Sequence, residues 1–383
     1  MVTKSTKRLL VTRPLQVLLL LPSSMSCHSG ASGGTGPNAT APPSTDPTPP
    51  ALHSARATAQ DAAAANTSVV SLPGASGGLG FDDLVFASRI RRILAPAAAS
   101  GILDLVDPDT MQVTPIAGFS SSRGTFRGGH GEGTTSADEG RGLLFAIDRT
   151  SGELDAVDPG AKAIVGRAKL AGSPDYVRWV EPTGEVWVTE PDSERVEVFS
   201  IAPGPKPNLV HSTNIPVKGG PESLVIDTTR KLAFTHLWRG SSVVIDIAKH
   251  APIATWPNGC GGSRGIAIDA KRGFLFAGCA EGRLVVMDVD HDGNELGEVS
   301  AGSGVDVIAY SPTLSHAYLP GAGSATMAFV GVAANGQLTV LGTVPTARGA
   351  HCVTADDRAN AWVCDPDRGQ LLVFKDSYGP GGS

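Results

Sequence analysis

The chain has 383 residues, a formal net charge of −6, and 18% charged and 41% hydrophobic residues. This length allows one large domain or two to three ordinary ones, and the acidic balance excludes the basic surface that nucleic-acid binding requires. The 47 glycines and 28 prolines disfavour long helices, which lose about 1 kcal/mol at an interior glycine and about 3 kcal/mol at a proline. No apolar run approaches the ~20 residues of a membrane-spanning helix.

Residues 1–27 have the pattern of an export signal. Four basic residues precede the apolar run 15–21, and small residues follow it up to Cys27. Cys27 stands where a bacterial lipoprotein signal keeps the cysteine that is acylated. The preceding Ser24-Met25-Ser26 departs from that pattern, so simple cleavage without a lipid stays open. We expect an exported protein, periplasmic or at the cell surface, that contacts a membrane only through a lipid on Cys27.

Residues 28–65 consist mainly of Gly, Ser, Thr, Pro and Ala. Such a segment buries too little apolar surface to offset the entropy lost on ordering, and the composition therefore predicts a disordered spacer. The globular part is expected to be a single domain spanning residues 66–378.

Short apolar runs recur through this domain. Seven runs that follow a turn read as one strand of a repeating unit: 93–97, 144–148, 186–190, 232–236, 275–279, 317–321 and 361–365. Their ends are 42 to 51 residues apart, and further apolar runs flank them, although the first unit shows no preceding run. Four short strands per unit of about 40–45 residues is the period of a β-propeller blade. The sequence therefore predicts an all-β, seven-bladed propeller rather than two stacked β-sandwiches.

The last unit ends after three strands, at Lys375. The segment 68–73, which lies before the first blade, has the pattern of a fourth strand. We expect it to complete blade seven, which would close the ring and remove an open sheet edge.

Segments of this repeat resemble a known family. Asp-Leu-Val-Asp at 104–107, Val-Trp-Val-Thr-Glu at 186–190 and Val-Val-Ile-Asp at 243–246 look like the Tyr-Val-Thr-Asn repeats of YncE-like bacterial propellers. The resemblance covers residues 68–378 and specifies a fold rather than a chemistry. It implies an exported propeller that serves as a binding module or scaffold.

Repeat register predicts which residues share one face of the ring. The residues 14 or 15 positions before each second-strand end fall at the start of the innermost strand: Asp82, Gly133, Asp175, Glu222, Arg264, Asp306 and His351. The second-strand ends should lie on the same face: Ala97, Asp148, Glu190, His236, Cys279, Gly321 and Asp365. One mouth of the central channel is therefore expected to be ringed by charge. Trp238, in the loop after a second strand, either stacks on a ligand there or packs over its loop.

Two roles for this charged mouth stay open. It could bind a small polar ligand, an ion or a protein, with contacts from Asp82, Asp175, Glu190, Glu222, His236, Arg264, Asp306, His351 and Asp365. No cofactor is required, but Asp175, Glu222, Asp306 and His351 are the candidate ligands for a divalent cation, since carboxylates suit Ca²⁺ or Mg²⁺ and imidazole adds a softer nitrogen. In the other interpretation the acids bond backbone N–H groups of the next blade and Arg264 neutralises two of them.

The favoured function is therefore a non-catalytic, monomeric binding propeller. The alternative is a metal-dependent hydrolase similar to the six-bladed gluconolactonase-type propellers, in which axial carboxylates hold a metal that polarises a lactone carbonyl. The seven units and the lack of an axial Asn in the predicted ring depart from that pattern.

The five cysteines divide by position. Cys27 belongs to the export segment, which leaves two in blade five and two in blade seven. Cys352 and Cys364 lie six residues either side of Arg358, so an antiparallel hairpin centred there places them opposite each other. Cys260 and Cys279 fall on one face of blade five. In an oxidising compartment we expect the disulfides 260–279 and 352–364.

Overall fold

Seven four-stranded antiparallel sheets form in the computed structural model, and each corresponds to one predicted repeat. The structure describes residues 67–380, apart from 76, 123–125, 127 and 204–205. The predicted export segment with Cys27 and the spacer 28–65 lie outside these residues. The described part is almost entirely β-structure, with two single-turn 3₁₀ helices, η1 (Pro191–Ser193) and η2 (Val289–His291).

The sheets, called blades 1 to 7, take their strands in chain order. Blade 1 consists of β2 (Val85–Ala87), β3 (Arg92–Pro96), β4 (Ile102–Val106) and β5 (Val113–Ala117). Blade 2 consists of β6 (Thr134–Gly140), β7 (Leu143–Asp148), β8 (Glu153–Asp158) and β9 (Ala163–Lys169). Blade 3 consists of β10 (Val177–Val180), β11 (Glu185–Glu190), β12 (Arg195–Ala202) and β13 (Asn208–Pro216).

The remaining blades follow the same order. Blade 4 consists of β14 (Val225–Asp227), β15 (Leu232–Leu237), β16 (Ser241–Asp246) and β17 (Ala251–Pro257). Blade 5 consists of β18 (Ser263–Asp269), β19 (Phe274–Cys279), β20 (Arg283–Asp288) and β21 (Asn294–Ser300). Blade 6 consists of β22 (Ala309–Ser311), β23 (His316–Gly321), β24 (Thr326–Val332) and β25 (Leu338–Pro345). Blade 7 consists of β26 (Val353–Ala355), β27 (Asn360–Asp365), β28 (Gln370–Lys375) and β1 (Thr67–Ser71).

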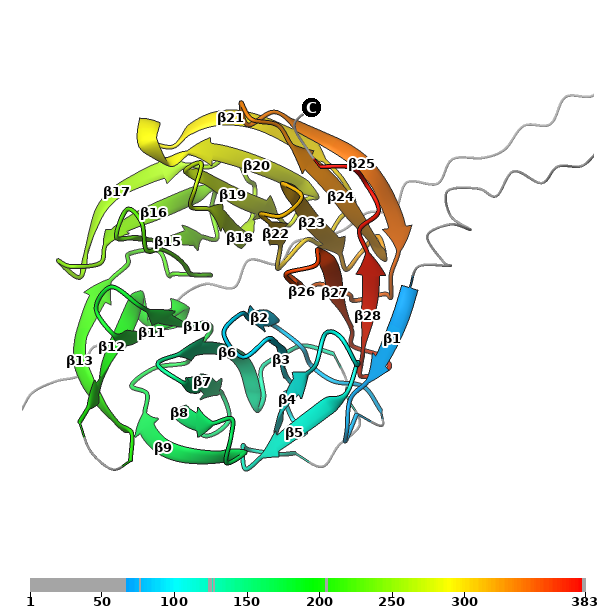
Figure 1. The fold of residues 1–383 in the computed structure, drawn as a ribbon. Helices are drawn as coiled ribbons and strands as arrows, with labels where there is room; N and C mark the ends of the chain where they lie inside the picture. Colours follow the sequence, from blue (N-terminus) through cyan, green and yellow to red (C-terminus); the bar gives the residue numbers. More distant parts are fainter. Residues whose placement is uncertain (1–66, 76, 123–125, 127, 204–205, 381–383) are drawn as a thin grey trace, which may run out of the picture. The chain divides into compact units, whose positions relative to one another are not determined.

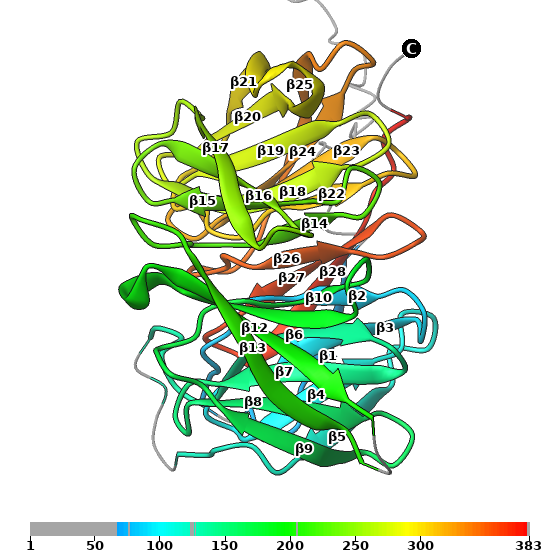
Figure 2. The ribbon, with the colours of Figure 1, turned by 90° about the vertical axis from the view of Figure 1, so that its left-hand side faces the viewer.

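The blades form a closed ring. The first strand of each blade contacts the first strand of the next, from β2 through β6, β10, β14, β18, β22 and β26 back to β2. These strands surround the centre in Figure 1. The outer strands β13 and β17 lie nearest the viewer in Figure 2. The predicted seven-bladed propeller is confirmed, and β2 supplies the inner strand of blade 1 that the sequence pattern did not reveal.

Blade 7 is completed by the N-terminal strand, as predicted. Strand β1 pairs with β28 over five residues, from Thr67 opposite Phe374 to Ser71 opposite Gln370, and the two strands lie side by side in Figure 1. Val70 and Leu72 are buried in a cluster that spans blades 1 and 7 and includes Trp362. The closing strand therefore contributes both backbone hydrogen bonds and apolar burial.

Apolar contacts between neighbouring blades form the core. Phe145 of blade 2 stacks on Trp179 of blade 3 with ring centroids 5.6 Å apart, and Phe276 of blade 5 stacks on Tyr310 of blade 6 at 5.0 Å. Trp187 and Trp362 are fully buried. Since each blade buries its faces against its neighbours, no blade has a complete core of its own.

Aspartates at the ends of strands fix the outer turns. Asp107 Oδ1 accepts hydrogen bonds from the backbone N–H groups of Asp109 and Thr110, and Asp158 Oδ1 accepts from those of Gly160 and Ala161. This bonding from an Asp side chain to its own turn is a frequent way to close tight turns. It explains why several of the repeated runs end in Asp.

A single substitution tests closure by β1. Val70 is 4% exposed and its neighbour Val69 is 53% exposed, so the two valines of one strand differ only in burial. We expect Val70→Ala to lower the free energy of unfolding by about 2 kcal/mol, and Val69→Ala to change it by less than about 0.5 kcal/mol. Urea denaturation measures both. Equal effects would contradict a packed closing strand.

A second prediction concerns a buried acid. Asp104 in β4 is fully buried and neither of its carboxylate oxygens has a hydrogen-bond partner, so burial raises its pKa to about 7. The folded protein then holds this proton more tightly than the unfolded chain, and stability falls as the pH rises from about 4 to about 7. Asp104→Asn should reduce that fall by up to about 4 kcal/mol. The exposed Asp192→Asn is the control, and a pH profile unchanged by Asp104→Asn would refute the prediction.

Candidate functional site

The chain entering each inner strand carries the predicted charged residues. Asp82, Asp175, Glu222, Asp306 and His351 lie two or three residues before their strands, and Arg264 is the second residue of β18. Ion pairs and electrostatic contacts link them across blades. The structure therefore brings the six side chains together at one mouth of the ring. The equivalent Gly133 of blade 2 adopts φ +68°, and a Cβ there would lie 2.0 Å from the carbonyl oxygen of Ala98. Glycine is required at that position.

Arg149 is the centre of one group at this mouth. Its guanidinium donates to Asp82 Oδ2 at 2.6 Å and to the carboxylate of Asp175, and its Nε donates to Thr135 Oγ1 at 2.9 Å. The Nδ1 atom of His130 also lies 3.1 Å from Asp82 Oδ2. We call Asp82, Arg149 and Asp175 the Arg149 cluster. It links the entrances of blades 1 and 3 through a residue that follows β7 of blade 2.

The two acids of the Arg149 cluster differ in pKa. Burial alone would raise the pKa of Asp82, but His130, Arg149 and His351 together hold it below its ordinary value. Burial, followed by repulsion from Asp82, raises the pKa of Asp175 to about 7 despite Arg149. The carboxylate of Asp82 in turn raises the pKa of His130. One arginine therefore supports one firmly ionised carboxylate and a second that takes up a proton near neutral pH.

A second group surrounds Arg264. Its Nη1 lies 3.7 Å from Glu222 Oε1 and 3.8 Å from Asp306 Oδ1, and its guanidinium carbon lies 4.3 Å from the centroid of the Trp238 ring. The indole N–H of Trp238 donates to Glu222 Oε2. We call Glu222, Trp238, Arg264 and Asp306 the Arg264 cluster. The half-exposed Trp238 therefore stacks on a cation of the protein.

The acids of the Arg264 cluster also have shifted pKa values. Burial, together with repulsion from Asp175 and Asp306, raises the pKa of Glu222 to about 9. Burial and the negative charge of Asp82 raise the pKa of Asp306. Glu222 is therefore protonated at neutral pH and is a poor ligand for a hard cation. The mouth thus combines carboxyl groups with the guanidinium groups of Arg149 and Arg264.

A cavity of about 380 Å³ opens at this mouth beside blades 5, 6 and 7. Its polar side chains include His130, Arg264, Asp306, His351 and Asp367, and its apolar lining includes Phe126, Ala280 and Ala322. The carboxylate of Asp306 makes no hydrogen bond with any described residue, and its contact with Arg264 is 3.8 Å long. A carboxylate left in this state can accept hydrogen bonds from a ligand.

The residues at the second-strand ends do not line this cavity. Glu190 accepts from Gly172 N at 2.9 Å and from Arg195 Nε at 2.6 Å, and Asp365 accepts from Arg368 and Gln370. His236 is fully buried, its Nδ1 lies 3.0 Å from Ser242 Oγ, and burial lowers its pKa to about 4. These three residues serve their own blades rather than the mouth.

The next residue along the chain takes that place instead. Arg149, Ala280, Ala322 and Pro366 each follow a second-strand end, and they belong to the Arg149 cluster or line the cavity. Glu190, His236 and Asp365 bond within or beside their own blade, whereas the residue after a second-strand end reaches the mouth, so the predicted position was displaced by one residue. Arg149 could have been found by shifting the register, whereas His130 lies in a loop with no counterpart in the repeat.

The proposed cation ligands do not all lie together. Asp175 and Glu222 lie in the two arginine clusters, whereas His351 lies with His130 and with Asp306, which also belongs to the Arg264 cluster. One nitrogen of each imidazole and one carboxylate oxygen of Asp306 lie within 4.8 Å of one another. The described residues thus retain half of the predicted set and add a histidine to it.

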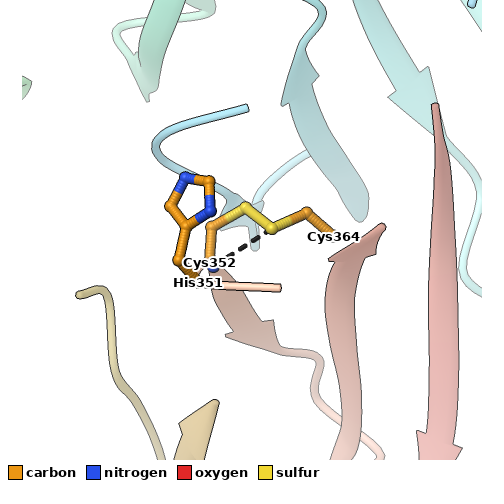
Figure 3. Close-up of side chains that lie close together, drawn as sticks. All are labelled: His351, Cys352 and Cys364. Carbon is orange, nitrogen blue, oxygen red and sulfur yellow. Dashed lines mark hydrogen bonds between the residues drawn. A yellow bond between two sulfur atoms is a disulfide. The ribbon is translucent and has the colours of Figure 1, made fainter. Parts of the chain in front are cut away.

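Both predicted cysteine pairs lie at disulfide distance. Cys260 and Cys279 have Cα atoms 5.1 Å apart, and Cys352 and Cys364 have Cα atoms 5.6 Å apart. The second pair joins β27 to the residue that precedes β26, next to His351 (Figure 3). The backbone N–H of Cys364 also donates to the carbonyl oxygen of Cys352 at 3.1 Å, as expected for residues opposite each other in a hairpin.

Comparisons with known proteins show the fold and nothing finer. No protein-family model matches the chain, and no curated protein matches it in sequence. The β-propeller domain of Myceliophteria thermophila Cps50 (Swd1) is 11% identical with a TM-score of 0.64, and the match covers 79% of this chain and 98% of that one. A chain of the Mitotic Checkpoint Complex is 12% identical with a TM-score of 0.63, covering 90% and 99%. A chain of Kuenenia stuttgartiensis Hydrazine Synthase is 13% identical with a TM-score of 0.63, covering 79% and 96%.

Substitution of Arg149 tests whether the mouth depends on charge compensation. Arg149→Met keeps the length of the side chain but leaves the carboxylates of Asp82 and Asp175 without their shared cation. We expect the free energy of unfolding to fall by about 3 kcal/mol. Arg89→Met is the matched control, because Arg89 and its partner Glu181 are both 53% exposed. It should change stability by at most about 1 kcal/mol. Chemical denaturation at pH 7 compares the two, and equal losses would show that Arg149 has no special role.

Proposed function

We propose that the protein is an exported, non-catalytic β-propeller that binds a small polar ligand in the mouth cavity. The observation that carries this proposal is the cavity itself. Its volume of about 380 Å³ falls within the range of small-molecule sites, about 300–1,000 Å³. Polar groups of both signs meet apolar side chains there, which is the usual composition of such a site.

The lining indicates the chemistry of the ligand. The carboxylate of Asp306 accepts hydrogen bonds, while the guanidinium of Arg264 is a donor held in place by Trp238. Phe126, Ala280 and Ala322 offer apolar contact on the remaining walls. A compact molecule that has both donor and acceptor groups, and a small apolar part, would use all of these contacts.

Other parts of the proposal rest on the sequence. The basic and apolar segment before Cys27 supports export, and the cysteine at position 27 supports attachment of a lipid. The spacer of residues 28–65 would then hold the propeller away from the membrane. The repeat segments support a relationship with the YncE-like propellers. In the described residues, no helix has the length and hydrophobicity that crossing a membrane requires.

A ligand screen with a blocked cavity tests the binding function. The purified protein would be screened by thermal shift against amino acids, hydroxy acids, sugars and nucleosides, in parallel with Ala322→Trp. Ala322 lines the cavity, so an indole there should fill it. A ligand at one hundred times its Kd stabilises the wild-type protein by about 2.7 kcal/mol, and we expect this effect to vanish in the variant.

The control places the same side chain elsewhere. Ala248 is exposed in the turn between β16 and β17, so Ala248→Trp should bind every ligand as the wild type does. If no compound binds, or if the compounds that bind do so equally well to Ala322→Trp, the cavity is not the ligand site.

A further inference from the structure

Two histidines and one aspartate meet at the wall of the cavity, each from a different segment. His130 comes from the chain between β5 and β6, Asp306 precedes β22, and His351 precedes β26. One nitrogen of each ring and a carboxylate oxygen of Asp306 lie within 4.8 Å of one another, and the two imidazole centroids are 5.6 Å apart. All three residues line the cavity.

We propose that His130, Asp306 and His351 bind a divalent first-row transition metal. The inference rests on the proposed function in one respect, because it places the metal in the wall of the same ligand cavity. Two imidazoles and one carboxylate are a donor set that suits Zn²⁺, Fe²⁺, Co²⁺ or Ni²⁺ better than Ca²⁺ or Mg²⁺, which prefer oxygen ligands alone.

Nδ1 of each ring faces an oxygen atom of the kind that orients a metal-binding histidine. Histidines that bind metals usually donate their second N–H to a carboxylate or a carbonyl, which fixes the tautomer. His130 Nδ1 lies 3.1 Å from Asp82 Oδ2, and Arg149 holds that carboxylate in turn. His351 Nδ1 lies 2.6 Å from the carbonyl oxygen of Gly349. Nε2 of each ring is therefore the nitrogen that would bind the metal.

Both ring nitrogens of His351 lie close to carbonyl oxygens. Its Nε2 lies 2.8 Å from the carbonyl oxygen of Phe81, while Nδ1 faces the carbonyl oxygen of Gly349. A neutral imidazole has one N–H and donates to one of these carbonyls, whereas an imidazolium donates to both. A metal on Nε2 would replace the contact with Phe81 and leave Nδ1 as the donor to Gly349.

Asp306 completes the set. Its carboxylate has no hydrogen bond with any described residue, and the metal would become its counter-ion in place of the more distant Arg264. Arg264 would keep its contact with the Trp238 ring. Small side-chain rotations would bring the three donor atoms to the usual distances of about 2.0–2.2 Å from zinc. With three protein ligands, a fourth position would face the cavity and could take water or an oxygen or nitrogen atom of the polar ligand.

Zinc titration of the full chain tests the site. All proteins would carry Cys27→Ser, because Cys27 is the thiol outside the two disulfides and could itself bind zinc. After EDTA treatment and dialysis, calorimetry should show one zinc per chain. In Asp306→Asn, which preserves side-chain size, and in His130→Gln the affinity should fall at least tenfold. Cobalt should give a visible absorption band that the same two variants lose.

The control removes a surface histidine that lies beside an acid. His291 Nδ1 lies 2.8 Å from Asp288 Oδ2 on the exposed turn of η2, so His291→Ala should leave zinc binding unchanged. Thermal melting of each variant establishes that it is folded. An absence of stoichiometric zinc in the parent protein would overturn the site, and so would unchanged affinity in folded Asp306→Asn and His130→Gln.

The two proposals fail in different ways. The ligand screen would be repeated in EDTA as well as with zinc. One result is that compounds bind as well in EDTA as with zinc and that the titration shows no bound zinc. It would overturn the metal site but not the proposed binding function. The opposite result is that the parent protein binds one zinc per chain, the two variants bind it more weakly, and no compound binds under either condition. It would support the metal site and overturn the small-ligand function.

Discussion

The ring depends on the pairing of β1 with β28. Within the described chain, blade 7 is the one sheet that is completed by strands from opposite ends of the sequence. Each other blade is a meander of consecutive strands and forms from local contacts. Without β1, β28 would present an open edge, and the apolar side of blade 7 would lose Val70 and Leu72. The contact between β26 and β2 joins the first and last blades on the inside, so this junction is closed on both its inner and its outer side.

Because the ring is closed, the residues that precede the seven inner strands lie around one axis. The charged side chains among them must therefore be compensated. The ring achieves this with arginines that reach from one blade to another. Arg149 lies between Asp82 and Asp175, whereas Arg178 of blade 3 pairs with Asp83, donating to Oδ2 at 2.6 Å and to Oδ1 at 3.2 Å. The adjacent residues Asp82 and Asp83 thus have separate cations. Acids without a close cation have raised pKa values, as Glu222 does. Asp306 also has no close cation and its pKa is also raised, but its side chain differs from that of Glu222 in lining the cavity.

The period of the sequence was sufficient to predict the blades, the closing strand and the positions that enter the inner strands. Each of these follows from counting, since one register applies to every unit. The mouth residues that follow the second strands were missed, because the repeat does not show whether the last residue of the strand or the residue after it reaches the mouth. Glu190 and His236 show the result, since their partners lie within their own blade. His130 belongs to the long segment between β5 and β6, which has no equivalent in other units, and repeat counting cannot reach such a residue.

Each disulfide includes a cysteine that is next in sequence to a residue lining the cavity. Cys279 precedes Ala280, which lines the cavity and whose N–H donates to the carbonyl oxygen of Gly262 at 2.8 Å, and Cys352 follows His351. One cross-link therefore lies within blade 5 and the other within blade 7, and the entrance residues of both blades, Arg264 and His351, line the cavity. A site built from loops gains affinity when its supports are rigid, because less entropy is lost on binding. Disulfides provide that rigidity only in an oxidising compartment. Preorganisation of the cavity therefore depends on an oxidising environment, and a reduced protein would keep its blades but hold the residues that line the cavity less firmly.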